Sequence, residues 1–140
     1  MKVLLAADGS TYTKKALAWL LTNENLPGVI DELVVLTVQP KLPARVITVM
    51  GRDDVSAYQQ DEARKVLAPI EKFLARHDVR WRTLTTIGPA AEEIVRVATR
   101  EKSALIVMGT HGRGALGRAV MGSVAQRVVA HSPVPVLLVR

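Results

Sequence analysis

The alternation of short apolar runs with amphipathic segments is the feature that most constrains how this chain can fold. Apolar residues recur at helical spacing between the runs, as Ala16, Leu17, Leu20 and Leu21 illustrate. Crossover helices join parallel strands and cover both faces of the sheet that those strands form. The sequence therefore predicts an α/β protein with five parallel strands, which we expect at residues 2–7, 33–38, 79–87, 104–108 and 133–139.

Two segments depart from this regular pattern. Residues 41–54 show no clear period, and Pro40 and Pro43 stand near their start, so we expect a surface loop there. The helix predicted around residues 63–74 contains Pro69, which removes a backbone donor, so this helix should kink or restart. Because no internal repeat or linker divides the 140 residues, we expect one domain over residues 1–140.

The order of the strands decides where a ligand would bind. Right-handed crossovers leave few possible orders, and we predict a doubly wound sheet of order 3-2-1-4-5. In such a sheet, ligands bind beyond the carboxyl ends of the strands, where the order reverses. The first strand leads into Asp8 and the fourth into Gly109, so the predicted topology places this carboxylate beside the segment that follows Gly109.

That segment has the composition of an anion-binding region. Five glycines fall between residues 109 and 122, and Ser123 and Gln126 have the spacing of a capping box at a helix start. Glycine lets backbone N–H groups approach a ligand, and a helix N-terminus favours negative charge. The net charge of +6 is also concentrated here, because residues 1–101 contribute +1 and residues 102–140, which contain no acid, contribute +5.

Two common phosphate-binding motifs fit this segment poorly. Residues 112–117 read G-x-G-x-x-G, but no acid follows Glu101 to bind a ribose, so we reject a dinucleotide site. Residues 112–119 approach a P-loop, but Arg118 replaces its lysine and Ala119 its magnesium-binding hydroxyl. The wider spacing G-x2-G-x9-G-[ST], from Gly109 to Ser123, is present in full.

This spacing, the opening strand that ends in Asp8-Gly9-Ser10 and the second strand that ends in Val38 make the whole chain resemble the universal stress protein family in its ATP-binding form. The resemblance implies a flavodoxin-like, Rossmann-like architecture. It also implies that Asp8 and Val38 flank the adenine and ribose, and that backbone N–H groups and the Ser123 hydroxyl hold the phosphates. The implied ATP site comprises Ala6, Ala7, Asp8, Val38, Met108, Gly109, Gly112, Gly122, Ser123 and Val124.

The resemblance implies a partner and a role as well. Family members form homodimers through the last strand, so the segment from Val134 to Val139 would pair with its copy and cover an apolar edge. Asp8 is the carboxylate that would meet a Mg²⁺ ion bound with ATP. Ala125 departs from the Ser or Thr of some ATP-binding members, which removes one phosphate contact. The implied function is a nucleotide-dependent regulatory module of the stress response, acting on a protein partner that the sequence does not identify.

Several residues also have simpler interpretations. Asp8 could cap the first helix or its turn, and Gly114 and Gly117 could serve only as flexible loop residues. Arg113 and Arg118 could be solvated as readily as they could clamp phosphate. A nucleotide-free dimeric scaffold of the same fold therefore stays as an alternative function.

Composition narrows the function classes. No nucleophile elbow and no metal-spaced histidines occur, so we nominate no catalytic residue and expect at most a weak ATPase, the second alternative. An aromatic content of 4% disfavours stacking on nucleic acid. The chain has no cysteine and no apolar run of membrane-spanning length, so we expect a cytoplasmic location without membrane contact.

Overall fold

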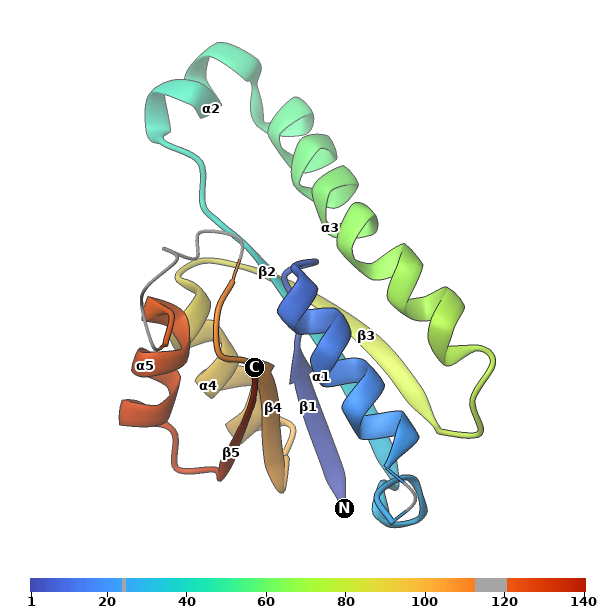
Figure 1. Ribbon diagram of the computed structural model, residues 1–140. Helices are drawn as coiled ribbons and strands as arrows, with labels where there is room; N and C mark the ends of the chain where they lie inside the picture. The colour runs from blue at the N-terminus through green and yellow to red at the C-terminus, as the bar shows by residue number, and fades with distance from the viewer. Residues whose placement is uncertain (24, 113–120) are drawn as a thin grey trace.

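The computed structural model describes residues 1–23, 25–112 and 121–140. Its strands are β1 (Lys2–Ala6), β2 (Glu32–Gln39), β3 (Trp81–Ile87), β4 (Leu105–Gly109) and β5 (Val136–Val139). Its helices are α1 (Thr11–Thr22), α2 (Ala44–Met50), α3 (Arg52–Leu74), α4 (Ala90–Arg100) and α5 (Ser123–His131), with a 3-10 turn at Pro27–Val29. Figure 1 shows the helices on the two sides of the central sheet.

The five strands form one parallel sheet in the order β3-β2-β1-β4-β5, which confirms the predicted order. In the centre, Leu4 of β1 is in register with Val34 of β2 and with Ile106 of β4. The order reverses between β1 and β4. The carboxyl ends of these two strands therefore lie side by side, and a crevice forms beyond them.

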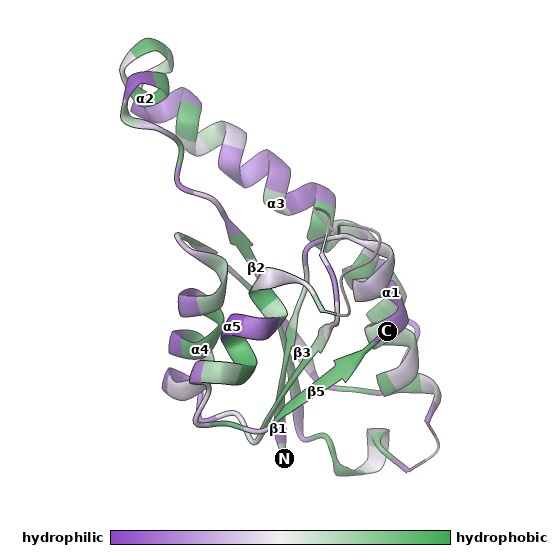
Figure 2. Ribbon diagram, turned by 60° about the vertical axis from the view of Figure 1, so that its left-hand side comes forward, coloured by the Kyte–Doolittle hydropathy of each residue, from purple (hydrophilic) through white to green (hydrophobic). Residues whose placement is uncertain are grey.

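Alternate residues of each strand fill two separate cores. Val3 and Leu5 belong to the core under α1 and α3, whereas Leu4, between them, belongs to the core under α4 and α5. All three side chains are fully buried. In Figure 2 the hydrophobic strands lie between α4 and α5 on one side and α1 and α3 on the other. Burial of both faces explains why the strands are continuous apolar runs rather than alternating ones.

The prediction of a loop over residues 41–54 is wrong. Ala44–Met50 form α2, and α3 begins at Arg52. α2 contains no buried residue and packs on α3, and Val49 is 85% exposed. Figure 1 shows α2 and the first turns of α3 standing away from the sheet. Because α2 covers no core, it lacks the apolar stripe by which a helix is predicted from sequence.

Prolines bear on two further elements, α3 and β5. The restart expected at Pro69 does not occur, because α3 continues across it. Pro69 lies on the exposed side of α3, so water can bind the carbonyl of Lys65 that loses its helical partner. The last strand begins only at Val136, since Pro133 and Pro135 cannot donate to a β-ladder.

In the described part of the chain, no helix is long and apolar enough to cross a membrane.

Candidate functional site

A cavity of about 400 Å³ opens at the carboxyl end of the sheet, where the strand order reverses. Its volume is in the range of small-molecule sites. The carboxyl ends of β1, β2 and β4 and the amino-terminal turns of α4 and α5 form its wall. All ten residues proposed from the sequence line it: Ala6, Ala7, Asp8, Val38, Met108, Gly109, Gly112, Gly122, Ser123 and Val124.

Seven further lining residues lay outside that predicted set: Thr13, Leu36, Ala90, Ile94, His111, Met121 and Ala125. Ala90 and Ile94 belong to the first turns of α4. A helix that follows a parallel strand starts at the same edge of the sheet as the ligand crevice, so this rule could have located both. Leu36 has no distinguishing signal, because the other apolar residues of β2 look the same in the sequence.

Side-chain hydrogen bonds hold the wall formed by the turn from β1 to α1. Ser10 caps α1, since its Oγ accepts from the N–H of Thr13 at 3.3 Å. Asp8 holds the turn rather than the helix end. Its Oδ1 accepts from the N–H of Ser10 at 2.9 Å and from the hydroxyl of Thr13 at 2.8 Å. The Asp8 carboxylate therefore has a defined orientation at the edge of the cavity.

Backbone hydrogen bonds hold the opposite wall. The N–H of Thr110 donates to the carbonyl of Val139 at 2.9 Å, and the N–H of Gly122 donates to the carbonyl of Thr110 at 2.7 Å. These two bonds join the end of β4 to β5 and to the start of α5. The N–H groups of the first turn of α5 have no acceptor within the helix. Ser123 and Val124 carry two of them and line the cavity.

The predicted capping box at this helix start is wrong. Gly122, rather than Ser123, is the N-cap, and Ser123 is the first helical residue, with no side chain capping the helix. The Gln126 amide instead donates to the carbonyl of Met121 at 3.1 Å. Because Ser123 caps nothing, its hydroxyl is not committed to the end of its own helix.

Two of the glycines are required by close packing. A Cβ on Gly109 would overlap the Cβ of Tyr12 in α1 and lie 3.1 Å from the Tyr12 carbonyl carbon. A Cβ on Gly112 would lie 2.6 Å from Oδ2 of Asp8. Glycine thus allows α1 to pack against the end of β4. It also allows the segment after β4 to lie directly against the Asp8 carboxylate, as the predicted topology requires.

His111 lies between the two walls. Its Nδ1 is 2.9 Å from Oγ1 of Thr110, and its ring centroid is 5.0 Å from that of Tyr12. Asp8 is the one carboxylate among the described lining residues. The described residues contain no group of three or more histidines and acids that could bind a metal. A Mg²⁺ ion would therefore need ligand oxygens and water to complete its shell.

Some residues of the sequence prediction lie outside the described part of the chain: Arg113, Gly114, Gly117 and Arg118. The proposals that the arginines clamp phosphate and that these glycines only make the loop flexible stay predictions. Gly112 and Gly122, which flank the segment, both line the cavity.

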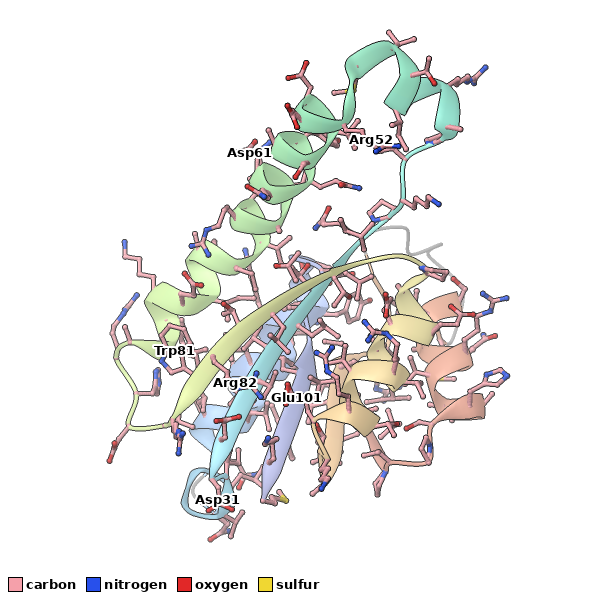
Figure 3. The ribbon with its side chains drawn as sticks, turned by 180° about the vertical axis from the view of Figure 1, so that it is seen from behind. Asp31, Arg52, Asp61, Trp81, Arg82 and Glu101 are labelled. Atoms are coloured by element: carbon pink, nitrogen blue, oxygen red, sulfur yellow. The ribbon has the colours of Figure 1, made fainter. Side chains whose placement is uncertain are left out.

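The amino end of the sheet carries an ion-pair network that the sequence analysis missed. Arg82 of β3 donates to Glu101 at 2.6 Å and to Glu32 of β2 at 3.0 Å, and Lys2 of β1 lies 3.7 Å from both carboxylates. In Figure 3, which views the molecule from the side opposite to Figure 1, Arg82 and Glu101 lie next to each other. The hydrogen bond from Arg82 lowers the pKa of Glu101 below its ordinary value. No motif marks these residues, because their contact depends on strand register.

The fold and the cavity define a doubly wound α/β protein with a ligand-sized cavity at the switch point of its sheet. The chain belongs to the universal stress protein family, whose family model matches residues 1–140. A Thermus aquaticus relative, the universal stress protein in the QAH/OAS sulfhydrylase 3′ region, is 38% identical, and the match covers 99% of this chain and 97% of the relative. The resemblance stated from the sequence is thereby confirmed.

Solved structures agree with this assignment. The structure of the Methanocaldococcus jannaschii universal stress protein MJ0577 superposes with a TM-score of 0.83 at 29% identity, covering 99% of this chain and 94% of that one. An Arabidopsis thaliana universal stress family protein, solved with AMP bound, superposes with a TM-score of 0.69 at 19% identity, covering 99% and 91% of the two chains. The second match shows the shared fold.

Proposed function

We propose that the cavity binds an adenine nucleotide, ATP in the first place, and that the chain is a single nucleotide-binding domain. The observation that carries the proposal is the meeting of two unlike walls in one cavity. A carboxylate oriented by hydrogen bonds, Asp8, lies on one wall, and a helix N-terminus with uncommitted donors lies on the other. A ligand with both sugar hydroxyls and phosphates suits such a pair of walls.

Different groups of lining residues suit different parts of the nucleotide. The apolar part of the cavity, formed by Leu36, Val38, Ala90, Ile94 and Met108, suits a flat base. Asp8 would accept hydrogen bonds from ribose hydroxyls. AMP in the Arabidopsis relative is consistent with an adenine nucleotide in this fold.

The phosphates would lie at the start of α5. The N–H groups of Ser123 and Val124 and the Ser123 hydroxyl are the donors that we assign to them. The N–H of Gly122 is not among these donors, because it already donates to the carbonyl of Thr110. Gly112 would let phosphate approach the backbone. Ala125 lines the cavity without a hydroxyl, so the resulting donor set is smaller than in relatives with Ser or Thr there.

We propose a binding module rather than an efficient enzyme. Among the described lining residues, Asp8 is the one carboxylate, and two of its hydrogen-bond donors come from its own turn. Asp8 is the carboxylate that would hold a Mg²⁺ ion accompanying ATP, and such an ion would supply charge stabilisation sufficient for slow hydrolysis at most. Turnover above about 1 s⁻¹, ordinary for an enzyme, would contradict the module.

We also propose that the protein is a homodimer joined by the last strand. β5 is an edge strand of the sheet, and its four residues are only half-buried in the single chain. An exposed apolar edge strand is a ready template for pairing. Antiparallel pairing of Val134 to Val139 with its copy would cover this edge. Sedimentation equilibrium that finds only the monomer would contradict this part of the proposal.

Titration calorimetry with ATP tests the site. Gly122→Val should lose detectable binding, because its Cβ would lie 3.3 Å from both the Cα of His111 and the carbonyl oxygen of Thr110 and its two methyl groups would occupy the approach of the phosphates. Gly28→Ala is the matched control, since nothing lies within 4 Å of the added Cβ. Unchanged ATP affinity in Gly122→Val would refute the site. Mass spectrometry of the freshly purified protein would show which nucleotide it retains.

A further inference from the structure

Thr13 has an unusual set of contacts for a residue in the first turn of a helix. Its side chain is almost fully buried, with 3% of the residue exposed, yet it lines the cavity. Its hydroxyl donates to Oδ1 of Asp8 at 2.8 Å, and the same hydroxyl oxygen accepts from the N–H of Asp8 at 3.1 Å. Thr13 thus grips both the side chain and the backbone of Asp8.

A threonine hydroxyl has a single proton to donate. In this structure that proton goes to Oδ1 of Asp8. Thr13 therefore has no donor left for a ligand in the cavity. Because its proton is given to Asp8, the Thr13 hydroxyl can help a ligand group that needs a hydrogen-bond donor only through Asp8.

The grip also sets the direction of the carboxylate. Oδ1 accepts two hydrogen bonds, from Thr13 and from the N–H of Ser10 at 2.9 Å. Oδ2 is directed to Gly112 on the other side of the crevice, within 2.6 Å of the position that a Cβ would take there. Without the Thr13 hydroxyl, the Asp8 carboxylate would lose one of the two hydrogen bonds to Oδ1. The bond from Ser10 and the contact with Gly112 would still restrain its torsions.

We propose that Thr13 is a positioning residue that determines how strongly the site discriminates nucleotides by their ribose hydroxyls. The proposal rests on the proposed function, because it concerns the same cavity. Thr13 orients Asp8 before a ligand arrives, so the carboxylate need not be ordered on binding. Preorganised acceptors lose less affinity to ordering than mobile ones. A merely structural role would instead affect every nucleotide equally.

The experiment compares two ligands and two substitutions by titration calorimetry. ATP carries both ribose hydroxyls, and 2′,3′-dideoxyATP carries neither. Thr13→Val removes the hydroxyl at nearly constant shape, and Thr13→Ser is the matched control that keeps it. We expect Thr13→Val to weaken ATP binding about tenfold, as for the loss of one hydrogen bond to a charged group, and dideoxyATP binding less than about twofold. Thr13→Ser should stay within about twofold of the unchanged chain for both ligands.

A second cycle asks whether the effect passes through Asp8. In an Asp8→Ala background, adding Thr13→Val should leave ATP affinity within about twofold, since the carboxylate that Thr13 positions is absent. Thermal unfolding of each variant without ligand gives the temperature below which that variant is folded. All titrations are made at one temperature at which every variant is folded.

The outcomes separate the inference from the function beneath it. If the unchanged chain binds neither nucleotide, the proposed function fails. If it binds both equally, nucleotide binding stands but the sugar contact and the role of Thr13 fail. If Thr13→Val weakens ATP and dideoxyATP by the same factor, or changes neither, Thr13 is structural and the inference is overturned. Selective loss of ATP affinity, restored in Thr13→Ser, supports it.

Discussion

The two ends of the sheet differ in the chemical groups that they carry. At the amino end, Arg82, Lys2, Glu32 and Glu101 neutralise one another across β1, β2, β3 and the end of α4. At the carboxyl end, the described wall of the cavity has one carboxylate, Asp8, and one histidine, His111, and is otherwise built from glycines, apolar residues and helix starts. The amino end is electrostatically complete, whereas the carboxyl end presents donors that a ligand can use.

This difference indicates how each end depends on its residues. The carboxyl end depends on distances of approach, because Gly109 and Gly112 leave no room for a Cβ. The amino end depends on charge, so it should respond to pH rather than to the size of a side chain. Substitutions at the carboxyl end should therefore have the larger effects on stability and on ligand binding.

The largest effect is expected at Gly109. Gly109→Val should lower the free energy of unfolding by about 3 kcal/mol or more, because the added atoms overlap Tyr12 and must push α1 away from β4. Urea denaturation measures the change. The control Gly28→Ala should stay within about 0.5 kcal/mol, as for a substitution away from packed groups. Equal stability of the Gly109 variant and the unchanged chain would show that α1 does not approach β4 so closely.

A smaller effect on stability and a larger one on binding are expected at Gly112. Gly112→Ala places a methyl group 2.6 Å from Oδ2 of Asp8, whose other oxygen is held by Ser10 and Thr13. We expect a loss in ATP affinity between about tenfold and a hundredfold, or about 1.4 to 2.7 kcal/mol. Calorimetry at a temperature where both proteins are folded measures it. Affinity equal to that of the unchanged chain would show that the contact between Gly112 and Asp8 is not needed for ATP binding.

The two serines at the helix starts should behave in opposite ways. Ser10→Ala removes the cap of α1 and should cost about 1 kcal/mol of stability. Ser123→Ala removes no cap, so its unfolding curve should match that of the unchanged chain while its ATP affinity falls about threefold to tenfold. Chemical denaturation and calorimetry on both variants test the pair. A loss of stability in Ser123→Ala would mean that the hydroxyl serves the fold.

The smallest effect is expected at the amino end, and it should depend on pH. Because Arg82 lowers the pKa of Glu101 in the folded chain, this pair stabilises the fold fully above the ordinary value of 4.5 and loses its effect as pH falls through the lower folded-state pKa. Glu101→Gln should therefore be less stable than the unchanged chain at pH 7, by up to about 1 kcal/mol, and this disadvantage should shrink as the pH falls below 4.5. Thermal unfolding of both proteins at several values between about pH 3 and pH 7 measures this difference in stability. A difference independent of pH would contradict the ion pair.

Much of the architecture follows from sequence patterns that report on burial. The strands are apolar because helices cover both of their faces, so the runs around Leu4 and Val34 were recognisable. Strand order then placed Asp8 beside Gly109 without any knowledge of side-chain contacts. The two cores and the position of the cavity were predictable because each depends on periodicity and on the handedness of crossovers.

The remainder depends on contacts that leave no periodic trace. α2 has no fully buried residue, so its apolar residues show no helical stripe that could reveal it. The N-cap of α5 moved from Ser123 to Gly122 because the N–H of Gly122 bonds to Thr110, a tertiary contact. The grip of Thr13 on Asp8 needs the fold of the β1–α1 turn, which a sequence spacing of five residues does not specify.

The tight approach of Gly109 to Tyr12 and of Gly112 to Asp8 bears on what a glycine signature can diagnose in a genome. Both glycines are demanded by neighbouring atoms of the chain itself, before any nucleotide arrives. A descendant that kept this scaffold but lost its ligand would keep both letters of the signature. Ser123, which caps no helix, would then be released to drift. Among chains that share the two glycines, the residue at the Ser123 position is therefore the better marker for sorting nucleotide binders from silent copies.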